Sequence, residues 1–227
     1  MKKIIGIFAA AAVMASIAAT AQAQTIAWGL AQPMVGDSEV ATNGTYFDAV
    51  NLNSSLASYT VNGEQFNATL GGGVGDGTIS ITGFGYGNYT GGTGVFTGGS
   101  TAYQNTMAGI DFVWGGGTGT VTLSSLTSGH TYQVQAWSYI GGADGPTTLT
   151  GSTPVTLTSA GQFSIGAFTA TGLTETFGYT DIANGNHAVI NAVSVRDTTV
   201  VPEPSTWAMM LGGLGMLLAG QRIRRRK

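Results

Sequence analysis

The sequence predicts an all-β protein whose main domain is a β-sandwich. Residues 24–199 are rich in Thr, Val, Ile, Phe, Tyr and Gly, in short runs separated by Gly, Asn, Asp and Ser. Short β-prone runs with frequent turn residues are typical of sandwiches and barrels. No stretch of this part shows the 3.6-residue apolar period of a helix. We therefore expect one domain of about ten to twelve strands.

Alternation of apolar and polar residues locates several of these strands. Ile79 and Ile81 alternate with Thr and Ser, as expected for a half-buried strand. In the run 132–137, the face with Tyr132, Val134 and Ala136 is the better candidate for the core. Further strands are expected at 45–52, 65–70, 110–114, 121–123, 162–169, 175–179 and 187–195.

The N-terminal residues predict a secretory signal peptide over residues 1–23. Lys2 and Lys3 form a positive start, and an apolar run follows from Ile4 to Ala19. Ala21-Gln22-Ala23 supplies the small residues that signal peptidase requires. We expect cleavage after Ala23.

The charge and cysteine content of residues 24–199 exclude several classes of function. This part contains one basic residue, Arg196, and ten acidic residues, which gives a net charge of −9. A chain with one basic residue cannot neutralise a row of phosphates, so we expect no nucleic-acid partner. The chain has no cysteine, which excludes disulfides, thiol catalysis and cysteine-ligated metal.

Residues 200–227 predict a separate segment in three parts. Pro202 and Pro204 restrict the backbone and hold Glu203 in an extended, exposed stretch. The apolar run 208–220 predicts a short transmembrane helix, below the usual span of about 17–25 residues. The tail that follows is basic and favours the cytoplasmic side of a membrane.

The order of these three parts resembles the PEP-CTERM sorting signal of bacterial surface proteins. The pattern V-P-E-P-S-x-W-A-x-x-L-x-G-L-x-x-L extends from Val201 to Leu217. The resemblance implies that an exosortase-type membrane protease recognises Pro202, Glu203 and Pro204. It also implies that the protein is exported, anchored by its C-terminal helix, and then released to the cell surface or extracellular matrix. The alternative is an ordinary single-span anchor.

A second resemblance concerns the main domain. Residues 125–134, 161–165 and 190–195 resemble strands of galactose-binding-like jelly-roll modules. This resemblance implies a jelly roll and favours non-catalytic carbohydrate binding, although such modules also serve as structural domains.

Four residues near the strand at 132–137 form the predicted sugar-binding site: Gln133, Gln135, Trp137 and Tyr139. An exposed aromatic ring packs against the apolar face of a sugar ring, and amide side chains form hydrogen bonds with the sugar hydroxyls. In the alternative interpretation, Trp137 and Tyr139 belong to the core and the opposite face of the strand is solvated. Large aromatic side chains are usually buried at least in part.

The sequence predicts no catalytic residue, no cofactor and no enzyme activity. His130 and His187 lack the close partner that a zinc site needs. Asp76, Asp144 and Asp181 lie among Gly and Asn and are candidates for a loop calcium site, with solvated turns as the alternative.

Three functions are consistent with these observations. The first is a non-catalytic module that associates with extracellular polysaccharide. The second is a structural protein of the envelope or biofilm that acts by self-association. The third, a secreted hydrolase, requires two carboxylates that face each other across a cleft.

Overall fold

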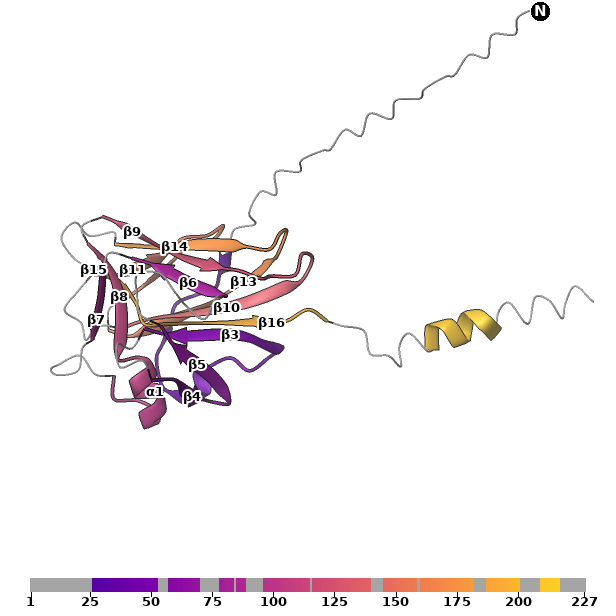
Figure 1. Ribbon diagram of the computed structural model, residues 1–227, viewed down its shortest axis with the longest axis horizontal. Helices are drawn as coiled ribbons and strands as arrows, with labels where there is room; N and C mark the ends of the chain where they lie inside the picture. The colour runs from indigo at the N-terminus through magenta and orange to yellow at the C-terminus, as the bar shows by residue number, and fades with distance from the viewer. Residues whose placement is uncertain are drawn as a thin grey trace, which may run out of the picture.

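A computed structural model describes residues 26–52, 57–69, 78–83, 85–88, 96–114, 116–139, 145–158, 160–181, 187–200 and 209–216. These residues form three β-sheets, in which most neighbouring strands are antiparallel, and a few short helices. This confirms the all-β prediction (Figure 1). The predicted signal peptide 1–23 and the motif Pro202-Glu203-Pro204 lie outside the described residues.

The largest sheet has eight strands in the order β1-β13-β10-β16-β3-β5-β4, with β2 paired to β13. Its strands are β1 (Ala27–Trp28), β2 (Gln32–Pro33), β3 (Thr45–Asn51), β4 (Tyr59–Val61), β5 (Glu64–Ala68), β10 (Thr131–Ser138), β13 (Gln162–Thr169) and β16 (Ala192–Asp197). Neighbouring strands are antiparallel except for β3 and β5, which are parallel.

A five-stranded sheet packs against the first, in the order β12-β11-β14-β9-β6. Its strands are β6 (Ile79–Thr82), β9 (Thr118–Leu123), β11 (Thr147–Leu149), β12 (Val155–Leu157) and β14 (Glu175–Asp181). A three-stranded sheet, β15-β8-β7, consists of β7 (Gly85–Asn88), β8 (Gly109–Trp114) and β15 (His187–Ile190).

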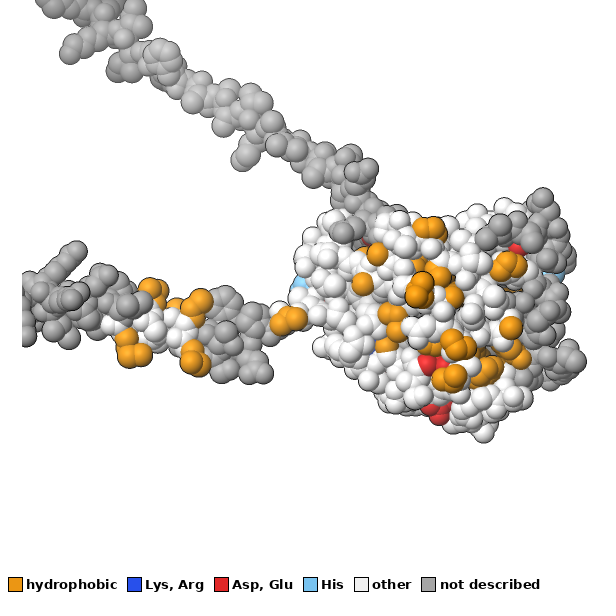
Figure 2. Space-filling model, turned by 180° about the vertical axis from the view of Figure 1, so that it is seen from behind, with side chains coloured by type: hydrophobic (Ala, Val, Ile, Leu, Met, Phe, Trp, Pro, Cys, Tyr) orange, Lys and Arg blue, Asp and Glu red, His pale blue; other side chains and the backbone are white. Residues whose placement is uncertain are grey.

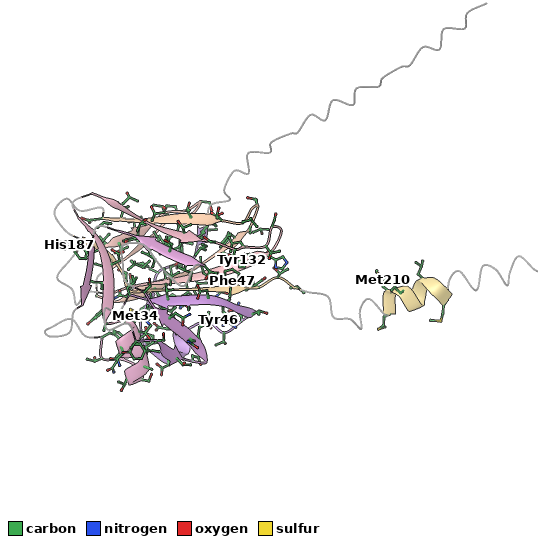
Figure 3. The ribbon with its side chains drawn as sticks, viewed as in Figure 1. Met34, Tyr46, Phe47, Tyr132, His187 and Met210 are labelled. Atoms are coloured by element: carbon green, nitrogen blue, oxygen red, sulfur yellow. The ribbon has the colours of Figure 1, made fainter. Side chains whose placement is uncertain are left out.

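The main core lies between the two larger sheets. Tyr132, Val134 and Ala136 are fully buried in it, as the alternation predicted. Trp28 from the large sheet meets Phe177 from the five-stranded sheet edge to face, with ring centroids 5.0 Å apart. Figure 3 shows Tyr132 with Phe47 inside the sandwich. This shared core makes the two sheets one β-sandwich.

A second apolar cluster covers the other face of the large sheet. The cover is formed by the 3₁₀-helix η1 (Asp37–Glu39), the helix α1 (Thr101–Thr106) and the β4–β5 hairpin, and Figure 1 shows α1 and β4 on this side. The cluster consists of Met34, Val40, Ala49, Val61, Phe66, Tyr103, Met107, Trp137, Phe163 and Ala192. The sequence did not predict α1, because six residues are too few to show a helical period.

The outward face of the five-stranded sheet contrasts with this covered face. Its strands alternate regularly between buried and more exposed positions. We call its outward positions the threonine face: Ser80, Thr82, Thr118, Thr120, Thr122, Thr148, Thr156, Thr176, Gly178 and Thr180.

The C-terminal segment contains a helix over residues 209–216, inside the run predicted to form a transmembrane helix. Among the residues that the structure describes, no helix has the length and apolar character needed to cross a membrane.

Candidate functional site

The residues predicted to bind sugar lie on a face that is covered. Trp137 is fully buried and Gln135 is 1% exposed, while Gln133 and Tyr139 are half-buried. The Trp137 ring packs against Phe66, with ring centroids 5.7 Å apart. The prediction of an exposed Trp137 is therefore wrong. The alternative interpretation is right that Trp137 and Tyr139 pack in an apolar cluster, but wrong that the opposite face is solvated, because Tyr132, Val134 and Ala136 are buried as well.

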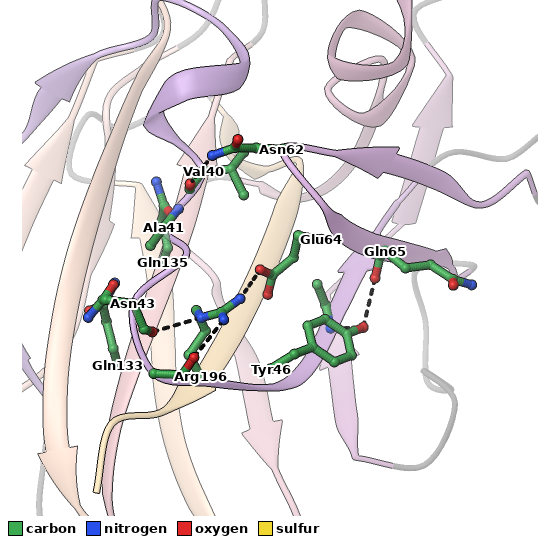
Figure 4. Close-up of polar contacts among 12 residues, drawn as sticks. Val40, Ala41, Asn43, Tyr46, Asn62, Glu64, Gln65, Gln133, Gln135 and Arg196 are labelled. Carbon is green, nitrogen blue, oxygen red and sulfur yellow. Dashed lines mark hydrogen bonds and ion pairs between the residues drawn. The ribbon is translucent and has the colours of Figure 1, made fainter. Parts of the chain in front are cut away.

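The segment from Glu39 to Asn43 forms much of this cover. Gln135 Nε2 donates to the carbonyl of Glu39 at 2.9 Å, and its Oε1 accepts from the amide of Ala41 at 3.0 Å. Gln133 Oε1 accepts from Asn43 Nδ2 at 2.6 Å. Figure 4 shows both glutamines beside their partners. The amides predicted to bind sugar hydroxyls therefore hold a segment of the same chain.

An open groove of about 480 Å³ lies next to this cover. Pro33, Val35, Phe163 and Ile165 supply its apolar lining, and Gln32, Ser38 and Glu39 its polar lining. Val35 is 64% exposed. Figure 2 shows a face on which hydrophobic side chains gather beside acidic ones. The groove thus combines an apolar surface with hydrogen-bonding groups and is accessible from solvent.

The carboxylate of Glu39 is fixed in the groove by four donors. Its Oε1 accepts from the Tyr103 hydroxyl and from Trp137 Nε1, the latter at 3.0 Å. Its Oε2 accepts from the amides of Val35 at 2.5 Å and Gly36 at 3.1 Å. Burial, together with the bond to Glu39, raises the pKa of Tyr103 far above its usual value, so the phenol stays a donor. Glu39 is therefore a rigid structural acceptor.

Two glycines allow the groove segment to approach the loop before α1. Gly36 has a φ of 134°, and a Cβ atom there would lie 2.7 Å from the Cα of Gly99. Asp37 Oδ1 then accepts from the amide of Ser100 at 3.1 Å and from its hydroxyl at 2.9 Å. A side chain at Gly36 would separate these segments, because both its backbone conformation and the space require glycine.

The other candidate residues lie at separate places in the described structure. His130 Nδ1 lies 2.6 Å from Asp197 Oδ2 at the partly exposed end of the sandwich. The ring of His187 packs against Phe112. Asp181 is buried, and no group of three potential metal ligands occurs among the residues described. Asp76 and Asp144 lie outside them. Calcium binding remains a sequence-based prediction.

A buried carboxyl at the start of β14 predicts a pH-dependent stability. Glu175 is 2% exposed, and this burial raises its pKa from 4.5 to about 7. The folded protein therefore retains a proton that the unfolded chain loses, so stability falls as pH rises through this window. We expect Glu175→Gln to match the wild type near pH ~4 and to be more stable at pH ~8, by up to ~3 kcal/mol. Urea unfolding at both pH values measures the difference, and an unchanged pH slope in the variant would contradict the assignment.

The C-terminal residues 200–227 define the class of this protein. In the sequence, Pro202, Glu203 and Pro204 are followed by an apolar run, which contains the helix at 209–216, and then by a basic tail. Residues 200–227 match the family model of the PEP-CTERM protein-sorting motif. The protein is therefore exported, membrane-anchored, and then released to the cell surface or extracellular space, with an exosortase as its processing protease.

The other comparisons found no relative for the main domain. No curated protein and no solved structure matches the chain. The resemblance to galactose-binding-like jelly rolls therefore stays a prediction, and the function of the domain must be argued from its own surface.

Proposed function

We propose that the protein is a non-catalytic surface protein whose β-sandwich domain associates with extracellular polysaccharide through the open groove. The groove lining supports this proposal. Its apolar wall of Val35, Phe163 and Ile165 suits the apolar face of a sugar ring. Gln32 and Ser38 offer donors and acceptors for sugar hydroxyls. Its location at the cell surface would bring such polymers into contact with the groove.

The groove does not suit hydrolysis of the bound sugar. Glycoside hydrolysis uses two carboxyl groups on opposite sides of the scissile bond, about 5–9 Å apart. Among the described residues that line the groove, Glu39 is the one carboxylate. Its two oxygens already accept four hydrogen bonds from the protein itself. These contacts favour binding over chemistry and support the proposal that the protein is not an enzyme.

A charged residue at position 35 tests the groove. We expect Val35→Asp to weaken binding to the producing cell's own extracellular polysaccharide about tenfold, because an apolar contact of ~1–2 kcal/mol is lost. The fold should not change, since the side chain is 64% exposed. Binding is measured by co-sedimentation of the protein, recovered from the cell surface, with the polymer.

Leu173→Asp is the matched control. Leu173 is 69% exposed and does not line the groove, so this variant should bind like the wild type. If the Val35→Asp variant bound the polymer as well as the wild type does, the groove would not be the binding site. A loss of self-association in the Val35 variant, without any polymer binding by the wild type, would replace the proposal with the structural, self-associating function.

A further inference from the structure

The threonine face of the five-stranded sheet is an ordered surface of small hydroxyl side chains. Facing residues on neighbouring strands are both threonine in five pairs: Thr148 with Thr156, Thr148 with Thr180, Thr118 with Thr180, Thr122 with Thr176, and Thr82 with Thr120. Strands lie about 4.8 Å apart, and alternate residues of one strand about 7 Å apart. The face therefore presents methyl and hydroxyl groups on a regular two-dimensional grid.

Most hydroxyls at the centre of this grid are available to a ligand. Thr148 Oγ1 and Thr156 Oγ1 bond each other at 3.0 Å, and Thr180 Oγ1 donates to the carbonyl of Gly117 at 2.9 Å. By contrast, the hydroxyls of Thr118, Thr120, Thr122 and Thr176 form no hydrogen bond with another described residue. Each can donate one hydrogen bond and accept others.

The chemistry of the face selects the kind of ligand. The ten positions that define the face include no charged side chain, whereas open faces of antiparallel sheets usually carry polar and charged groups. An ionic polymer would find no counter-charge here. An oily ligand would have to desolvate the hydroxyls without replacing their hydrogen bonds. Threonine is stiff at χ1, so little side-chain entropy is lost on binding.

We propose that the threonine face binds an uncharged polysaccharide chain. Such a chain offers hydroxyls to the free threonine hydroxyls and C–H surfaces to the methyl groups. A second copy of the protein is a poorer partner, because the face is small. It spans four strand spacings in one direction and one Thr-x-Thr-x-Thr row in the other, an area of only ~270 Å². A stable dimer buries ~800 Å² on each partner. A flat crystal such as ice is also a poorer partner, because sheets twist and a flexible chain can follow that twist.

This surface is separate from the groove. The groove is lined by Phe163 and Ile165, whose side chains pack with the cluster on the outer side of the large sheet. The threonine face lies on the outer side of the five-stranded sheet, and the main core separates the two sheets. The two proposals therefore rest on different residues, and each can fail alone.

The test removes hydroxyls from β9 without changing its shape. In the triple variant Thr118→Val, Thr120→Val and Thr122→Val, valine keeps the β-branch and favours strands. The probes are amorphous cellulose, β-1,3-glucan and agarose, all uncharged, with alginate as the anionic comparison. We expect the wild-type protein to sediment with at least one uncharged probe and the triple variant to bind it at least tenfold more weakly.

Controls and readouts distinguish the possible outcomes. Thr45→Val and Thr60→Val change exposed threonines on β3 and β4 of the large sheet and should leave binding unchanged. Leu173→Asp, which lies outside both the groove and the threonine face, should also bind the uncharged probes normally. A loss of binding in Val35→Asp but not in the triple variant would assign these probes to the groove and overturn the proposal. Equal binding by the triple variant would overturn the proposal, as would absence of binding to all three uncharged probes. Enrichment of the wild type in growing ice, lost in the triple variant, would overturn it in favour of ice.

Discussion

Replacing Arg196 with methionine is expected to destabilise the fold by about 3–5 kcal/mol, because it leaves a buried carboxylate without its partner. Arg196 Nη1 pairs with Oε2 of Glu64, whose side chain is fully buried (Figure 4). The guanidinium also donates from Nε to the carbonyl of Asn43 and from Nη2 to that of Gly44, both at 2.8 Å. The single basic residue of the domain thus joins β16, β5 and the start of β3.

The expected loss depends on pH in a direction that identifies the pair. Burial raises the pKa of Glu64, and the Arg196 charge and hydrogen bond oppose this rise. Without Arg196 the folded-state pKa of Glu64 rises further. The variant can then be relieved by taking up a proton at low pH, so its destabilisation should be larger at pH ~8 than at pH ~4. Urea unfolding at the two pH values measures both the size and the trend.

Two further variants make this prediction falsifiable. Glu64→Leu combined with Arg196→Met replaces the pair by apolar groups and should recover most of the lost stability. His130→Ala breaks the pair with Asp197, whose side chains are 34% and 23% exposed, and should cost less than ~1 kcal/mol. If the double variant were no more stable than Arg196→Met, the unpaired charge of Glu64 would not be the cause.

The alternation of apolar and polar residues correctly predicted the face of the large sheet that lines the main core. It did not predict that the other face is covered as well. The bounds 162–169 were found correctly, and Tyr132, Val134 and Ala136 were assigned to the core. Alternation shows that a strand has two faces, but not whether another segment covers the second. The cover over Trp137 consists of the 3₁₀-helix η1, the six-residue helix α1 and the β4–β5 hairpin, and no spacing within the strand at 132–137 reveals them.

The strand β8 also shows that local spacing does not determine where individual side chains are buried. Its apolar positions Ile110 and Phe112 pack with Val189 in a small cluster that is separate from the main core. Val113 faces the main core, and Asp111 is fully buried beside Tyr179, whose pKa is raised by burial and by this carboxylate. Long-range contacts of this kind determine which face is buried, and local spacing does not encode them.

Neither the groove nor the threonine face was singled out from the sequence, for different physical reasons. The groove joins residues 32–39 to residues 163–165, and only the pairing of β2 with β13 brings these segments together. The threonine face was visible as alternation in individual strands, yet its continuity depends on the strand order β12-β11-β14-β9-β6. A surface built from five strands exists only once their registers are known.

Asn191→Leu is expected to destabilise the fold by about 3–5 kcal/mol, because one buried amide completes the backbone bonding of three segments. Asn191 is fully buried. Its Oδ1 accepts from the amide of Tyr139 at 2.6 Å, and its Nδ2 donates to the carbonyls of Met107 at 2.8 Å, Tyr139 at 3.0 Å and Gly109 at 3.1 Å. The side chain thus connects the ends of β10 and α1 with the start of β8.

Leucine has a similar volume but neither donates nor accepts, so the amide and carbonyls that face it lose their partner while they remain covered. Urea unfolding measures the global effect, and hydrogen exchange of the Tyr139 amide reports the local one, which should become faster by more than the global change alone explains. Asn43→Ala is the matched control, because the Asn43 side chain makes an exposed bond to Gln133 and should contribute less than ~1 kcal/mol. Comparable stability of the two variants would show that the buried amide does not determine how these three segments meet. A large effect confined to Asn191 would establish that one polar side chain fixes the junction between the large sheet, α1 and the three-stranded sheet.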